Sequence, residues 1–356
     1  MKPDFNNCIL NVTSSIMNRF NEVSKYQSIK EVDELIKNSK HVFFVVLDGL
    51  GKNIIEEHLY ENSFIRRNLL KWITSVYPPT TVAATTCCLS GVAPGESGWV
   101  GWHQYFIDIK KDVVVFKNTY AYEEGSPDFS VSEKYIPYTP FYEKFKNVKC
   151  EELYPDFREG GFSKFRLMCK RMVEISKLDY PTYTYCYWTN PDSLMHICGI
   201  KHNAVRKVIN DLDKQLEKAF SKCGESTSII MIADHGLVDI EDIILSDYPD
   251  FVETLEILPS LESRATSFKV KDRVKFEELF EKYFSQYFKL YTKEEFIKEG
   301  YLGDIVDKAL PFLLDYVSVA TSHYAFSYQK GDMKMKAAHA GGLEEEMMIP
   351  LVVVSK

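Results

Sequence analysis

The sequence predicts an α/β fold with a mostly parallel central sheet flanked by helices. Three short, almost wholly apolar runs, at residues 41–47, 182–188 and 228–233, indicate strands. Runs without polar alternation are typical of strands that are buried on both faces of a parallel sheet. Segments with helical periodicity at 28–38 and 165–175 precede the first two runs. The chain therefore alternates strands and helices as βαβ units do.

A run of small residues after the first strand predicts a further helix, which ends at Gly91. Two prolines and then Thr80 and Thr81 precede it. These threonines have two interpretations. A threonine at this position caps the helix. Alternatively, its hydroxyl meets a phosphoryl group that the helix N-terminus binds through its free amides and partial positive charge.

The next segment, residues 91–106, is rich in glycine and aromatic residues. We predict a loop that lines a pocket. Trp99, Trp102 and His103 are candidate substrate contacts in it. For the two tryptophans, packing in the core or in a lid is the alternative.

The pattern changes after residue 250, where a charged amphipathic helix and short strands replace the βαβ pattern. We expect residues 251–335 to form a small inserted α+β lobe. The catalytic core would then comprise residues 1–250 and 336–356. The elements predicted in this part of the chain are strands at 264–270, 316–320, 324–327 and 349–354 and a helix at 274–288.

The overall charge argues against a nucleic-acid-binding protein. The 356 residues include 43 Lys and Arg but 51 Asp and Glu, for a net charge of −8. An anionic substrate then needs locally supplied positive charge, which bound metal ions provide. The eight cysteines form no CxxC pair, and neither a signal peptide nor an apolar run of membrane-spanning length is evident. We expect a cytoplasmic protein without a membrane segment.

Ligand-type residues stand at strand ends or in loops of four segments that are remote in sequence. The six side chains are three carboxylates and three imidazoles: Asp48, Asp192, His196, Asp234, His235 and His339. Functional groups in open α/β sheets gather at the carboxyl ends of strands. Ordinary Asp/Gly turns, an Asp N-cap and a stray histidine are the structural alternatives for single members.

Carboxylate and histidine ligands suit Zn²⁺, or Mn²⁺ in a more open site. If Asp192 opens a helical turn, His196 lies on the same face, at a spacing that metal ligands use. Six ligands and a threonine hydroxyl are enough for two metal ions. Pairs of metal ions roughly 4 Å apart are common in enzymes that catalyse displacement at phosphorus.

A series of short motifs runs along nearly the whole chain. In order, they are Val46-Leu-Asp48-Gly, Tyr77-Pro-Pro-Thr-Thr81, Leu89-Ser-Gly91, Gly98, Pro191-Asp192-Ser-Leu-Met-His196, Ala233-Asp234-His235-Gly236, His339, Gly-Gly-Leu343 and Pro350-Leu. These motifs, in this order, resemble the alkaline phosphatase superfamily, and within it the type I phosphodiesterase/nucleotide pyrophosphatase family.

The resemblance implies an alkaline phosphatase-like fold and a role for each matching residue. Thr81 would be the nucleophile and form a phosphothreonine, with Thr80 as its neighbour in the substrate site. One zinc ion would be bound by Asp48, Asp234 and His235 and would touch the Thr81 oxygen. The other would be bound by Asp192, His196 and His339. The substrate would be a small anionic phosphate ester or a nucleotide.

The chain departs from the family pattern at two positions. Ala84 stands where many relatives carry an asparagine that contacts the phosphoryl oxygens. The final motif reads His339-Ala-Gly-Gly, one residue longer than is common. A sulfatase is disfavoured because no Cys-x-Pro-x-Arg motif stands at the nucleophile.

The leading hypothesis is a two-metal hydrolase of phosphodiesters or nucleotide pyrophosphates. The alternatives on the same scaffold are a phosphomonoesterase, a phosphonate hydrolase and a phosphotransfer mutase. A metal-stabilised binding protein without catalysis is the alternative from another class.

Overall fold

The structure, a computed structural model, describes residues 1–328 and 335–356. The chain forms two compact units. Unit 1 comprises Met1–Pro3, Val76–Tyr138 and Val238–Met347, and unit 2 comprises Asp4–Ser75, Thr139–Leu237 and Met348–Lys356. The predicted inserted lobe, residues 251–335, falls inside unit 1, which also takes in residues 76–138. The division into a core and a lobe stays a prediction.

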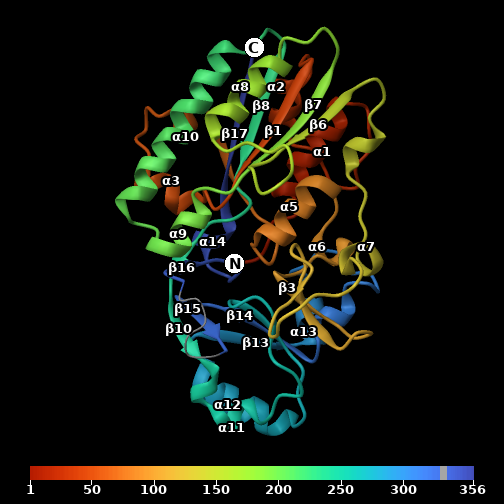
Figure 1. Cartoon of the computed structure of the whole chain (residues 1–356), viewed down its shortest axis with the longest axis vertical. Helices are drawn as coiled ribbons and strands as arrows, with labels where there is room; N and C mark the ends of the chain where they lie inside the picture. The colour runs from red at the N-terminus through yellow and green to blue at the C-terminus, as the bar shows by residue number, and fades with distance from the viewer. Residues whose placement is uncertain (329–334) are drawn as a thin grey trace. The chain divides into compact units, whose positions relative to one another are not determined.

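Unit 2 contains a six-stranded sheet with helices beside it (Figure 1), in the strand order β2-β17-β8-β1-β7-β6. All neighbouring strands pair in parallel except where β17 lies between β8 and β2. The strands are β1 (His41–Leu47), β2 (Leu69–Thr74), β6 (Lys149–Leu153), β7 (Thr182–Trp188), β8 (Thr227–Ile232) and β17 (Met348–Ser355). The mostly parallel α/β sheet is thus confirmed.

Three adjacent inner strands of this sheet, β8, β1 and β7, are the three predicted from apolar runs. Every residue of β1, β7 and β8 is buried, as expected for strands covered on both faces. β2 and β6 were not predicted. Their residues are mostly half-buried, so neither segment has the uniform apolar pattern that marked the central strands.

The helices of unit 2 are amphipathic or short. Their bounds are α1 (Ile9–Arg19), α2 (Lys30–Ile36), α3 (Lys52–His58), α4 (Phe64–Arg67), α8 (Phe165–Ile175), α9 (Asp192–Cys198) and α10 (Asn203–Lys222). The sequence predictions missed α10, although Val205, Ile209, Leu212 and Leu216 give it a buried stripe at helical spacing. A 3₁₀ turn, Phe141–Lys144, completes the unit.

Unit 1 is built on an antiparallel sheet with the strand order β13-β14-β12-β11-β3-β4-β5. Its strands are β3 (His103–Phe106), β4 (Lys111–Val114), β5 (Thr119–Tyr120), β11 (Ser260–Leu261), β12 (Ala265–Phe268), β13 (Phe288–Thr292) and β14 (Tyr316–Ala320). Two small pairs, β10 (Glu241–Ile244) with β15 (Tyr324–Ser327) and β9 (Val238–Asp239) with β16 (Ala337–Ala338), complete the strands described.

The helices of unit 1 are short except for α5 and α12. Their bounds are α5 (Thr81–Ser90), α6 (Pro94–Ser97), α7 (Val131–Tyr135), α11 (Pro249–Val252), α12 (Arg273–Phe284), α13 (Lys293–Lys298) and α14 (Glu344–Met347), with 3₁₀ turns at Leu245–Asp247 and Leu310–Leu313.

The structure corrects two of the predictions for unit 1. The helix predicted at 274–288 ends at Phe284, because the segment 288–292 pairs with β14 as β13. The loop predicted at 91–106 contains α6 and β3. The helix predicted to end at Gly91 is confirmed as α5. Gly91 adopts a left-handed conformation (φ 71°) after its last turn, a conformation that glycine takes at little cost.

None of the helices in the described residues has the length and apolar character of a membrane-spanning segment.

Candidate functional site

Three neighbouring strands of unit 2 end in the predicted ligand residues. Asp48 follows β1, Asp234 and His235 follow β8, and Asp192 begins α9 four residues after β7. Since β1 pairs in parallel with both β7 and β8, the carboxyl ends of all three strands meet at one edge of the sheet. The topology therefore gathers side chains that are up to 187 positions apart in the chain.

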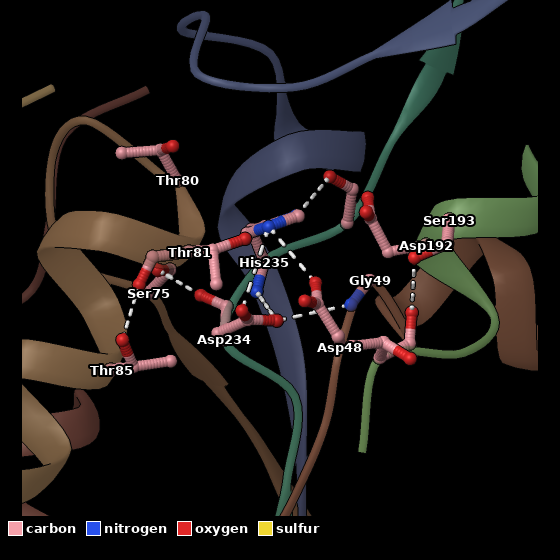
Figure 2. Close-up of polar contacts among 12 residues, drawn as sticks. Asp48, Gly49, Ser75, Thr80, Thr81, Thr85, Asp192, Ser193, Asp234 and His235 are labelled. Atoms are coloured by element: carbon pink, nitrogen blue, oxygen red, sulfur yellow. Dashed lines mark hydrogen bonds and ion pairs between the residues drawn. The ribbon is translucent and has the colours of Figure 1, made fainter. Parts of the chain in front are cut away.

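The side chains of Asp48, Asp192, Asp234 and His235 point toward one another at this edge (Figure 2). His235 Nε2 lies 3.3 Å from Asp48 Oδ1 and 3.6 Å from Asp234 Oδ2. Asp48, Asp192 and His235 each offer a ligand atom within 4.8 Å of the others. The set is buried: Asp234 and His235 are fully covered, and Asp48 and Asp192 are 2% and 7% exposed.

Three carboxylates in one buried place repel each other. At 4.8 Å and an effective dielectric constant of 20, a pair of unit negative charges costs about 3 kcal/mol. Burial, and then the charges of Asp234 and Asp192, accordingly raise the pKa of Asp48 well above its usual range. Asp234 Oδ2 is buried and accepts no hydrogen bond from the described residues. A divalent cation fits here, because it would bind this oxygen and offset the repulsion.

His196 lies beside Asp192, as its spacing in the sequence predicts. Both belong to α9, and His196 Nε2 is 3.1 Å from Asp192 Oδ1. The side chain of His196 is 20% exposed, so this end of the cluster is more open than the end at Asp234.

Three further residues hold the cluster in place, and none was predicted from the sequence. The Gly49 amide donates to Asp234 Oδ1 over 3.0 Å, and the Ser75 hydroxyl donates to the Asp234 carbonyl oxygen. The Tyr187 hydroxyl donates to Asp48 Oδ2. Burial, reinforced by the charge of Asp48, raises the pKa of Tyr187 well above its usual value, so it stays a donor. Tyr187 sits one residue before the end of β7, a position that a search for strand-end polar groups could have examined.

Gly49, in the loop after β1, has little room for a side chain. Its φ is +74°, and an added Cβ would lie 2.8 Å from Asp192 Cβ and 2.7 Å from Leu237 Cδ1. We expect Gly49→Ala to lower the free energy of unfolding by about 2–4 kcal/mol, from left-handed strain plus overpacking. The measurement is urea unfolding followed by circular dichroism.

Gly160 provides the matched control for this substitution. It has nearly the same φ, +76°, but an added Cβ would meet nothing within 4 Å. Gly160→Ala should cost only the backbone strain, about 1–2 kcal/mol. Equal losses in the two variants would contradict the close packing against Asp192.

The two threonines lie in unit 1 at the start of α5, and they differ in burial and in hydrogen bonding. Thr80 is fully buried, and its Oγ1 donates to Glu262 Oε1 over 2.7 Å and caps no helix amide. Thr81 is the first residue of α5 and is half-buried. Its carbonyl accepts a hydrogen bond from Thr85 Oγ1 over 2.6 Å. The capping interpretation therefore does not explain the hydroxyl of Thr80, which instead binds a residue that the sequence predictions overlooked.

The three candidate substrate contacts differ in burial and in the contacts that they make. Trp99 is 6% exposed and donates its ring N–H to the carbonyl of Ile136, which favours the packing alternative. Trp102 is half-buried and donates its backbone amide to Glu262 Oε1 over 2.7 Å. His103 borders a cavity of about 80 Å³ in unit 1. Their roles toward a substrate stay predictions.

The cavity beside His103 has both polar and aromatic lining residues. Glu262, Thr266, Tyr122, Phe326 and Tyr328 are among its lining residues. His103 Nδ1 lies 2.7 Å from Asp112 Oδ1. Burial by itself would lower the pKa of His103, but the negative charges of Asp112 and Glu262 outweigh it and raise that pKa.

His339, the remaining predicted ligand, belongs to unit 1. It directly follows β16 and is half-buried. The next residue, Ala340, is fully buried and has a φ of +84°. His339 therefore begins a sharply turned segment that leads to α14.

An α/β chain with aspartate and histidine side chains gathered at the carboxyl ends of parallel strands is typical of a metal-dependent enzyme. The model of the type I phosphodiesterase / nucleotide pyrophosphatase family matches residues 112–340, well over half of the chain. The chain belongs to this family.

Solved structures show the same fold. Murine ectonucleotide pyrophosphatase/phosphodiesterase 5 superposes with a TM-score of 0.70 at 18% identity, covering 88% of both chains. An inactive variant of it in complex with AMP gives 0.67 at 18% identity and 87% coverage of both. The human protein gives 0.66 at 17% identity, with 88% of this chain and 87% of that chain covered. A comparison with curated proteins gave no match.

Proposed function

We propose that this protein is a two-metal hydrolase that cleaves phosphodiester or nucleotide pyrophosphate bonds through a phosphothreonine at Thr81. The observation that carries the proposal is the buried cluster of Asp48, Asp192, Asp234 and His235, in a chain that belongs to this family. Membership of the family supports hydrolysis of phosphodiester bonds. The cluster supports a divalent cation.

Two sets of three residues would hold the metals. Asp48, Asp234 and His235 form one set, and Asp192, His196 and His339 form the other. Zn²⁺ suits these oxygen and nitrogen ligands, and Mn²⁺ is the second choice. When bound, the two ions stabilise the negative charge on the phosphoryl oxygens and on the leaving oxygen.

Thr81 is the better nucleophile of the two threonines. Thr80 is fully buried and its hydroxyl is committed to Glu262, whereas Thr81 is half-buried at the N-terminus of α5, where free amides favour a phosphoryl anion. An inactive threonine-to-alanine variant of the murine relative was solved with AMP, which supports both a threonine nucleophile and a nucleotide ligand.

The proposed reaction has two displacements. Thr81 Oγ gives its proton to solvent and bonds to phosphorus as the bond from phosphorus to the leaving oxygen breaks, and the leaving group departs as an alcohol or a phosphate. Water then attacks the phosphothreonine. This releases a phosphomonoester and restores the Thr81 hydroxyl.

A panel of chromogenic esters tests the substrate class. We expect bis(p-nitrophenyl) phosphate to be turned over with a kcat/KM about tenfold or more above that of p-nitrophenyl phosphate, with Zn²⁺ present in both assays. Faster turnover of the monoester would overturn the diesterase proposal. Absence of turnover with both esters would favour a binding protein without catalysis.

One observation favours the monoester alternative. Ala84, fully buried on α5, offers no side-chain amide to the phosphoryl group, unlike the asparagine expected in many relatives. A phosphomonoesterase, a phosphonate hydrolase or a phosphotransfer mutase would share every proposed ligand. The same panel, extended with a phosphonate monoester, separates these activities.

A further inference from the structure

Unit 1 contains a fully buried ion pair whose two residues are not proposed metal ligands. Arg264 directly precedes β12, and Glu346 lies on α14. Neither side chain has any solvent exposure. Two parallel hydrogen bonds join them, from Arg264 Nε to Glu346 Oε1 over 2.7 Å and from the Arg264 Nη2 to Glu346 Oε2 over 2.9 Å. The remaining Arg264 nitrogen, Nη1, donates to the Tyr324 carbonyl over 2.6 Å.

The carboxylate of Glu346 also binds the segment that follows His339. Its Oε1 accepts from the Gly341 amide over 2.7 Å, and its Oε2 accepts from the Leu343 amide over 3.1 Å. The Gly342 amide between them donates to the Ala320 carbonyl over 2.9 Å. Three consecutive amides after His339 and Ala340 are therefore fixed, two of them by one carboxylate whose position Arg264 sets.

The backbone of this segment lies close against the ion pair. A Cβ at Gly341 would lie 2.5 Å from Glu346 Oε2 and 2.8 Å from Arg264 Nη2, so only glycine fits against the pair. Ala340 holds a left-handed φ of +84°, which costs a residue with a Cβ about 1–2 kcal/mol. The strained turn persists because the surrounding contacts determine it, which is typical of functional sites.

We propose that Arg264 and Glu346 are positioning residues that set the place of the His339 imidazole for metal binding. The inference rests on the proposed function, in which His339 is a ligand of the second metal. Metal–ligand distances tolerate about 0.2 Å, so a histidine on a turn needs a fixed backbone. Stability alone explains the pair poorly, because buried ion pairs are often no more stabilising than apolar residues of the same volume.

Zn²⁺ titration of the full chain, after removal of metal by chelation, tests the proposal without relying on activity. A chromophoric chelator competes for Zn²⁺ and reports the two affinities. In the double variant Arg264→Met/Glu346→Leu, which leaves no unpaired buried charge, we expect one affinity unchanged and the other weakened about 10–100-fold. His339→Ala should weaken the same affinity. Adding it to the double variant should cause little further loss, because both changes act on one ligand.

The controls separate positioning from folding. Tyr316→Phe removes a hydroxyl that donates to the exposed Glu277 in the same unit, and it should leave both affinities within about twofold. Arg264→Lys keeps the positive charge but cannot make the two parallel hydrogen bonds. The Zn²⁺ affinity that is weakened in the double variant should therefore also be weakened in Arg264→Lys. If circular dichroism shows that the double variant does not fold, Gly341→Ala replaces it, because its Cβ displaces the carboxylate without removing a charge.

Each outcome is decisive. Wild-type affinities in a folded double variant, or in folded Gly341→Ala, would overturn the positioning role. If the wild-type chain binds fewer than two Zn²⁺ ions, or if His339→Ala changes neither affinity, the second metal site of the proposed function is wrong instead.

Discussion

Replacement of Thr81 by alanine should abolish turnover while leaving the metal content unchanged. If Thr81 Oγ is the atom that attacks phosphorus, its removal deletes the covalent route, and kcat should fall by about 10³-fold or more. A loss of that size is about 4 kcal/mol in the activation barrier. The measurements are kcat with the chromogenic diester and metal per chain by elemental analysis.

Two variants at the same place test the assignment. Thr81→Ser keeps a hydroxyl and should retain kcat within about tenfold, because the nucleophilic oxygen remains. Thr80→Ala removes a buried hydroxyl that donates to Glu262. Its main effect should be a lower free energy of unfolding, with a smaller effect on kcat. If Thr80→Ala abolished turnover and Thr81→Ala remained active, Thr80 would be the nucleophile. If both variants stayed active, the phosphothreonine mechanism would be wrong.

Removal of metal should have an effect of similar size. We expect protein purified without chelator to contain close to two divalent ions per chain. Dialysis against a chelator should lower turnover about 10³-fold or more, and added Zn²⁺ should restore it. Protein that is active and free of metal would contradict the proposed function.

Asp234→Asn tests the cluster itself. The substitution removes a fully buried charge beside His235, so metal affinity should fall by about 10²-fold or more. In the absence of metal, the same change relieves the repulsion of Asp48 by Asp234. The metal-free variant should therefore unfold at a higher temperature than the metal-free wild type, which differential scanning calorimetry measures.

A second buried aspartate of unit 2 serves as the control. Asp213 on α10 accepts hydrogen bonds from the backbone amides of Phe64 and Ile65, over 3.1 and 2.7 Å. Asp213→Asn weakens these bonds and should destabilise both the metal-free and the metal-bound protein without changing metal content. If Asp213→Asn lost metal as Asp234→Asn does, the effect would be one of folding, not of ligation.

Local patterns were sufficient to predict the centre of the sheet. The strands β1, β7 and β8 are short apolar runs because both faces of each are buried, and burial on both faces leaves a signal in every residue. The pair Asp192 and His196 was predictable for a similar reason, since a helix brings residues i and i+4 together regardless of the rest of the fold. The edge strands β2 and β6 lack such a signal because they are only partly covered.

The sequence by itself determined which residue types stand at strand ends and the family that their order indicates. Tertiary structure decided everything that depends on contact between remote segments. Tyr187 donates a hydrogen bond to Asp48, and Thr80 donates one to Glu262. Arg264 pairs with Glu346, which lies 82 positions further along the chain. The physical reason is that a buried polar group needs a partner, and the fold, not the local sequence, brings that partner within hydrogen-bonding distance.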